Sequence, residues 1–179
     1  MTESVPPISG REQRPRVGIL GIGNLLLGDE GFGVHCINRL QERYIFPEQV
    51  RLLDGGTAGI MLAPFIESQD LLYVIDVVAL EGEPGSVHCF SAEELRRGAL
   101  NRSMSPHQLG LLEILELCRL RERLPQLIEL ITVIPRDLQT GIGLSPVLGK
   151  SLDAVEERLL GSLARQGITV SRRRESGDA

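Results

Sequence analysis

Apolar and polar positions follow two alternating patterns along the chain. Short, largely apolar segments that predict strands alternate with segments of helical spacing, and the first of them is the nearly continuous apolar run typical of a strand buried on both faces of a parallel sheet. The runs that predict strands are 16–23, 50–53, 71–78, 86–90 and 127–134. The segments that predict helices are 31–44, 57–67, 91–97, 105–120 and 151–166. This alternation predicts an α/β fold, a three-layer αβα sandwich around a mostly parallel, twisted, five-stranded sheet.

One strand of this sheet is expected to run against the others. Only residues 79–85, which include Pro84 and Gly85, separate the strand at 71–78 from the strand at 86–90. A parallel crossover needs about a dozen residues or more. We therefore expect the strand at 86–90 to be antiparallel to the strand at 71–78.

The ends of the predicted helices carry recognisable signals. Ser105 fits the N-cap of the helix at 105–120, with Pro106 in its first turn and Gln108 completing a capping box. Pro64 is expected to break or kink the helix at 57–67, and Ser151 to cap the last helix. The predicted organisation is a disordered extension over 1–15, a single domain over 16–170 and a flexible polar tail over 171–179.

Composition narrows the classes of partner. The 179 residues carry a net charge of −5, which argues against a nucleic-acid partner. No segment approaches the roughly 18 consecutive apolar residues of a membrane span. The three cysteines are far apart and form no CxxC pair, which favours reduced thiols in the cytoplasm. We expect a cytoplasmic protein, a monomer, with neither nucleic acid nor membrane as partner.

Acidic residues follow the predicted strands at the ends where ligands bind in open α/β sheets. Glu30 comes after the first strand and Asp54 after the second, Asp76 interrupts the third, and Asp137 follows the fifth. His107 opens a helix whose positive N-terminal end favours the neutral, metal-binding imidazole. One histidine with two carboxylates suits a divalent ion such as nickel, zinc, iron or manganese. We therefore predict a metal site built by Glu30, Asp76 and His107.

Each of these residues also has a purely structural interpretation. Asp29 or Glu30 alone can complement a helix dipole, and Asp54 before two glycines can make a turn hydrogen bond. His107 can be an ordinary residue at a helix start. Asp76 is different, because an ionised carboxylate within a buried strand needs a partner. For the remaining residues, spacing alone does not decide between the structural and the functional interpretation.

The glycine-rich corner at 21–33 also suggests a rival function. Gly21-x-Gly23 after a strand matches the start of a dinucleotide-binding fingerprint, but Leu26 stands where that motif needs glycine or a small residue. Asp29 and Glu30 would moreover face the pyrophosphate. The pattern therefore argues against nucleotide binding.

Several motifs, taken in order, resemble the hydrogenase maturation protease family, the endopeptidases that process large subunits of nickel–iron hydrogenases. The resemblance covers about 16–167, and outside it lie the N-terminal extension and the Arg-rich tail. Its motifs are Gly-Ile-Gly-Asn at 21–24, Gly-Asp-Glu-Gly-Phe-Gly at 28–33, Asp-Gly-Gly-Thr-Ala-Gly at 54–59, Val-Ile-Asp at 74–76 and Ser-Pro-His-Gln at 105–108.

The resemblance implies both a site and a task. Glu30, Asp76 and His107 match the three metal-binding positions of the family. The implied task is removal of a short C-terminal extension from the large-subunit precursor after nickel insertion, with the substrate-held nickel as signal. Zinc or cadmium could replace nickel in a crystal. Asp29 or Asp54 is a candidate general base, and the alternative function is a non-proteolytic, metal-sensing chaperone of the same precursor.

Overall fold

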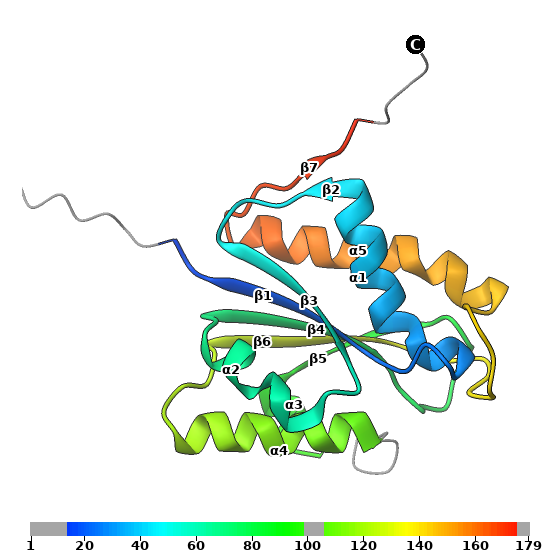
Figure 1. The fold of residues 1–179 in the computed structure, drawn as a ribbon, viewed down its shortest axis with the longest axis horizontal. Coiled ribbons are helices and arrows are strands. Elements are labelled where there is room, and N and C mark those ends of the chain that lie inside the picture. The colour runs from blue at the N-terminus through cyan, green and yellow to red at the C-terminus, as the bar shows by residue number, and fades with distance from the viewer. Residues whose placement is uncertain (1–13, 99–105, 175–179) are drawn as a thin grey trace, which may run out of the picture.

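A mixed five-stranded sheet forms the centre of the molecule (Figure 1). The computed structural model describes residues 14–98 and 106–174, with side chains in the second range from residue 109. The strand order is β3-β1-β4-β6-β5. The strand bounds are β1 Val17–Ile22, β3 Val50–Gly56, β4 Leu71–Val77, β5 Val87–Ser91 and β6 Leu127–Val133.

Helices cover both faces of this sheet (Figure 1). Helices α1 (Phe32–Arg43) and α5 (Pro146–Arg165) pack on one face. Helices α2 (Ala63–Glu67), α3 (Ala92–Arg96) and α4 (Pro106–Leu120) contribute to the core on the other face. Strand β1 is buried along its whole length, which explains its continuous apolar run. The predicted three-layer sandwich is confirmed.

Strand β5 is the one antiparallel member of the sheet. It pairs with β6, with Val87 opposite Val133, and lies at the sheet edge. Its direction is therefore as predicted, but β6 separates it from β4. The short link after β4 passes the end of β6, and Gly85 N–H donates to the carbonyl of Ile134 at 2.8 Å.

Two helix boundaries differ from the sequence prediction. The last helix, α5, begins at Pro146 with Ser145 as N-cap, so the prediction that Ser151 caps it is wrong. Ser151 lies inside α5, where its hydroxyl donates to the carbonyl of Gly85 at 2.9 Å. The segment predicted as one broken helix is a 3-10 turn, η2 (Gly59–Leu62), followed by α2, with Pro64 in the first turn of α2.

The C-terminal boundary of the folded part lies later than residue 170. Ser171 and Arg172 form β7, which pairs antiparallel with β2 (Tyr44–Ile45). The predicted tail therefore contributes two residues to a small second sheet. The predicted N-terminal extension lies almost entirely outside the described residues. No helix in 14–98 or 106–174 has the length and apolar character needed to cross a bilayer.

Candidate functional site

The carboxyl ends of four parallel strands form one edge of the sheet. Strands β1, β3, β4 and β6 all run in the same direction. Glu30 lies in the 3-10 turn η1 (Gly28–Gly31) after β1, Asp54 lies near the end of β3, Asp76 near the end of β4, and Asp137 after β6. The structure thus confirms that these four acids belong to the same edge.

The glycine corner folds tightly over the end of β1. A Cβ atom at Gly33 would lie 2.3 Å from the carbonyl oxygens of both Ile22 and Ile75. A Cβ atom at Gly23, where φ is +146°, would lie 2.0 Å from the carbonyl oxygen of Glu30. Only glycine permits this approach. The corner therefore brings η1 and the start of α1 directly against the ends of β1 and β4.

Asp76 is the most perturbed carboxylate at this edge. Its side chain is 0% exposed, and Oδ1 accepts a hydrogen bond from Val77 N–H at 2.8 Å. Among the residues whose side chains are described, none donates to Oδ2. Burial, with a smaller contribution from the Glu30 carboxylate, raises the pKa of Asp76 to about 8 against the opposing effect of the Val77 N–H. The electrostatic coupling indicates that Glu30 and Asp76 lie near each other, in surroundings that favour a proton or a metal cation.

The third predicted ligand, His107, lies in the first turn of α4, but its side chain is outside the described part of the chain. Across the described residues, no group of three His, Cys, Asp or Glu side chains comes together as a metal site. The Glu30, Asp76 and His107 triad therefore stays a prediction. The first turns of α4 do lie close to the carboxyl edge of the sheet, since Gly110 shares a cavity with Ile22 and Gly56 at the ends of β1 and β3.

Asp29 has a different environment from its neighbour Glu30. It is 1% exposed and accepts four hydrogen bonds from the segment after β6. Ser145 donates its N–H to Oδ1 at 2.7 Å and its hydroxyl to Oδ2 at 3.0 Å. The N–H groups of Arg136 and Asp137 also donate to Oδ2, at 2.9 and 3.1 Å. Asp29 thus fastens the loop before α5 to the corner after β1.

Ser145 is a structural residue that the sequence prediction missed. Its signal was present, because serine directly before proline is typical of an N-cap followed by the first helical turn. In the structure its hydroxyl also accepts from Leu148 N–H at 3.4 Å while donating to Asp29.

Asp54 makes the turn hydrogen bond that its structural interpretation predicts. Its Oδ1 accepts from Gly56 N–H at 2.9 Å. The side chain is nevertheless exposed to solvent, unlike that of Asp29. Its carboxylate is therefore held in place and remains accessible from outside.

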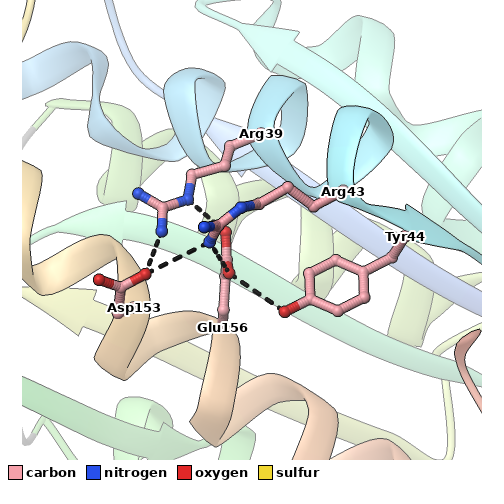
Figure 2. Close-up of polar contacts among 5 residues, drawn as sticks. All are labelled: Arg39, Arg43, Tyr44, Asp153 and Glu156. Atoms are coloured by element: carbon pink, nitrogen blue, oxygen red, sulfur yellow. Dashed lines mark hydrogen bonds and ion pairs between the residues drawn. The ribbon is translucent and has the colours of Figure 1, made fainter. Parts of the chain in front are cut away.

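A second charged cluster lies between α1 and α5, shown in Figure 2. The buried Glu156 forms ion pairs with Arg39 (Nε to Oε1, 2.7 Å) and Arg43 (Nη1 to Oε2, 3.0 Å). The Tyr44 hydroxyl donates to Oε2 at 3.3 Å, and Asp153 pairs with both arginines. The helical periodicity gave no indication of this cluster. Its charges are balanced internally, so it acts as a clamp between two helices.

Comparisons with known proteins agree with this geometry. The family model described as Hydrogenase maturation protease matches residues 34–162. The Hydrogenase 2 maturation protease of Escherichia coli (strain K12) is 37% identical over 154 residues, which cover 86% of this chain and 93% of that protein. The hydrogenase expression/formation protein HoxM of Azotobacter vinelandii is 40% identical over 162 residues, covering 86% of this chain and 78% of that protein.

Solved structures share the fold. The hydrogenase maturating endopeptidase HybD from E. coli matches with a TM-score of 0.83 at 37% identity, over 88% of this chain and 98% of that one. The [NiFe] hydrogenase maturation protease HybD from Thermococcus kodakarensis matches with a TM-score of 0.70 at 27% identity, over 82% and 98% of the two chains. With the sheet, the family model and the sequence relatives in agreement, the chain belongs to the hydrogenase maturation protease family.

Proposed function

We propose that this protein is an endopeptidase that removes a short C-terminal extension from the large-subunit precursor of a nickel–iron hydrogenase after nickel insertion. Membership of a maturation protease family supports the precursor as substrate. The observation that carries the proposal is Asp76, a fully buried carboxylate whose Oδ2 accepts no hydrogen bond from the described side chains and whose pKa burial raises to about 8. A buried carboxylate of this kind is suited to bind a cation that arrives with the substrate.

The nickel ion is held by the precursor and so forms part of the substrate. Glu30, Asp76 and His107 are proposed to bind it, and the tight glycine corner keeps η1 against β4 so that Glu30 faces the same edge as Asp76. A bound nickel ion supplies Lewis acidity, which either polarises the scissile carbonyl or lowers the pKa of an attacking water. In this proposal the three side chains position the ion that the precursor holds.

Asp54 is the better of the two candidate general bases. A base must have an oxygen that can reach the attacking water. Both oxygens of Asp29 accept hydrogen bonds, and its side chain is 1% exposed. Asp54 is exposed, and the only hydrogen bond described for it leaves Oδ2 available. We therefore propose that Asp54 accepts the proton of the attacking water.

Mass spectrometry of the precursor tests the proposed function. Purified enzyme is incubated with nickel-loaded and with nickel-free precursor, and both products are weighed. Truncation of the nickel-loaded precursor alone is expected. Binding without truncation in either sample would instead support the metal-sensing chaperone, and equal truncation of both would remove nickel as the signal.

Replacement of Asp54 by asparagine tests its role as base. The amide oxygen of Asn can still accept from Gly56 N–H, so the turn and the melting temperature should be unchanged. Loss of a general base lowers the rate by about 10²- to 10⁴-fold. Single-turnover cleavage of nickel-loaded precursor measures this, and a wild-type rate for Asp54→Asn would exclude Asp54 as the base.

A further inference from the structure

A small apolar cavity lies beside the proposed site. Its volume is about 140 Å³, and its lining comes from the ends of β1 and β3, from η2 and from α4. The walls are made by Ile22, Leu62, Leu111 and Ile114, all at least nine-tenths buried. Thr57 supplies the one polar side chain among the lining residues, and none of them is charged.

Glycines form part of the lining of this cavity. Gly59 and Gly110 face it from η2 and α4, and a Cβ atom at either position would meet no atom within 4 Å. A larger side chain at Gly110 would therefore meet no clash at its Cβ, whereas at Gly59 the backbone φ of +52° itself favours glycine. The two glycines therefore add no side chain to the lining of the cavity.

The position of the cavity links it to cleavage. Ile22 ends β1 and lies at the start of the glycine-rich corner that carries Glu30, and Gly56 belongs to the turn that Asp54 stabilises. Gly110 lies one helical turn after His107 on α4. A peptide bound at the carboxyl edge of the sheet would therefore pass next to the cavity.

The size and chemistry of the cavity select one kind of occupant. An apolar protein cavity of about 150 Å³ accommodates a molecule of the size of benzene. A valine, leucine, isoleucine or methionine side chain falls in the same range, and an apolar lining disfavours a charged side chain. Beside the cavity, Ile60 (58% exposed), Met61 (78%) and Leu109 (52%) offer an apolar surface to the adjoining peptide.

We propose that this cavity is a specificity subsite that receives one aliphatic side chain of the substrate segment that is cleaved. The inference rests on the proposed protease function. It adds a second feature of the substrate, besides the metal, that the enzyme recognises. It makes the fit of a single side chain a condition for correct placement of the scissile bond.

A pair of matched glycine substitutions tests the subsite. Gly110→Leu fills the cavity, whereas Gly161→Leu introduces the same side chain on α5, where a Cβ atom would lie 3.8 Å from Arg165 Nη1 and away from the cavity. Both replacements raise helix propensity, so neither should lower the melting temperature. We expect kcat/KM on nickel-loaded precursor to fall at least tenfold for Gly110→Leu and to stay unchanged for Gly161→Leu.

Substrate variants give the second arm. Each aliphatic residue near the cleaved bond of the precursor is replaced by alanine, one at a time, and cleaved by both the unchanged enzyme and Gly110→Leu. At one position the unchanged enzyme should lose activity on the alanine precursor, while Gly110→Leu should prefer it over the natural precursor.

The two arms separate the possible failures. If Gly110→Leu cleaves the natural precursor as fast as the unchanged enzyme, or prefers no alanine precursor, the subsite is overturned and the protease function stands. If the unchanged enzyme cleaves no nickel-loaded precursor, the proposed function and the subsite are overturned together.

Discussion

Asp76 and Glu156 are both buried carboxylates, yet their surroundings are opposite. Glu156 is 3% exposed and is surrounded by Arg39, Arg43 and Tyr44, which supply two positive charges and a hydroxyl donor (Figure 2). Asp76 is 0% exposed and, among the described residues, accepts only from the N–H of its own neighbour Val77, with the Glu30 carboxylate close enough to raise its pKa. One acid has its partners within the fold, and the other lies beside a second acid.

The difference separates a structural charge from a functional one. A buried carboxylate is costly unless hydrogen bonds and opposite charges compensate for lost hydration. For Glu156 the compensation comes from α1, so the pair holds α1 against α5. For Asp76 no cation among the described side chains plays this role, and the cost is avoided by a proton or, as we propose, by the substrate's metal ion. The two carboxylates should therefore respond in opposite ways to the same kind of mutation.

The largest effect is expected for the proposed metal ligands. Asp76→Asn, Glu30→Gln and His107→Ala should each leave a folded protein that processes nickel-loaded precursor at least ~10³-fold more slowly, because several kcal/mol of metal-dependent stabilisation of the transition state are lost. Circular dichroism checks the fold and mass spectrometry the cleavage. Glu156→Gln is the matched control and should cleave normally once folded. Processing by His107→Ala at the wild-type rate would remove the histidine from the ligand set.

The next effect is a dependence of stability on pH. Because the pKa of Asp76 is about 8 in the folded state and 3.8 is its ordinary value, the folded protein holds a proton between these values that the unfolded chain has lost. Asp76 therefore does not lower the free energy of unfolding below about pH 4. As the pH rises from there to about 8 it lowers this free energy by on the order of 6 kcal/mol.

Urea unfolding with a chelator present, at pH 5 and at pH 8, measures this contribution. Asp76→Asn removes the titrating group, so it should lose less stability over this interval than the wild-type protein does. Glu156→Gln should retain the wild-type dependence. If the wild-type protein and Asp76→Asn lost the same stability between pH 5 and pH 8, Asp76 would not be the source of the pH dependence.

A smaller effect is expected for the α1–α5 clamp. Glu156→Gln removes the buried carboxylate that pairs with Arg39 and Arg43. Both arginines keep the exposed Asp153 as a partner and reach solvent themselves, with side-chain exposures of 23% and 36%. We expect a loss of roughly 3 kcal/mol in the free energy of unfolding, at the low end for a broken buried pair. The Arg39→Met, Glu156→Leu double variant should recover part of this loss. An unchanged urea midpoint for Glu156→Gln would contradict the clamp.

The layers and the common acidic edge were predictable because they follow from patterns that are local in sequence. Short, largely apolar segments identified the four parallel strands of the large sheet, and parallel strands must bring Glu30, Asp54 and Asp76 to one edge. The pairing of β2 with β7 was not predictable, because two residues per strand carry no periodicity. The apolar cavity was equally hidden, since Gly59, Gly110 and the other lining residues come from separate elements.

The division of roles between Asp29 and Glu30 could not be deduced from the sequence either. The two residues are adjacent in the same 3-10 turn, and both suit a helix N-terminus. What distinguishes them is Ser145, a partner 116 positions away from Asp29 along the chain. Only the packing of α5 against the glycine-rich corner shows that Asp29 binds the loop before α5, whereas Glu30 lies beside Asp76.

Asp29 therefore gives the smallest expected effect and sharpens the contrast with Asp76. Asp29→Asn keeps one acceptor but turns an NH₂ group toward donors from Arg136, Asp137 or Ser145, so we expect a loss of roughly 2 kcal/mol in the free energy of unfolding. Because Asp29 acts on the loop rather than on the substrate, cleavage by the folded variant should fall by less than about tenfold, in line with its loss of loop order. Urea unfolding and single-turnover cleavage measured on the same preparation separate the two. A rate loss of ~10²-fold or more at an unchanged unfolding midpoint would instead be the signature of a general base, and would assign to Asp29 the role proposed for Asp54.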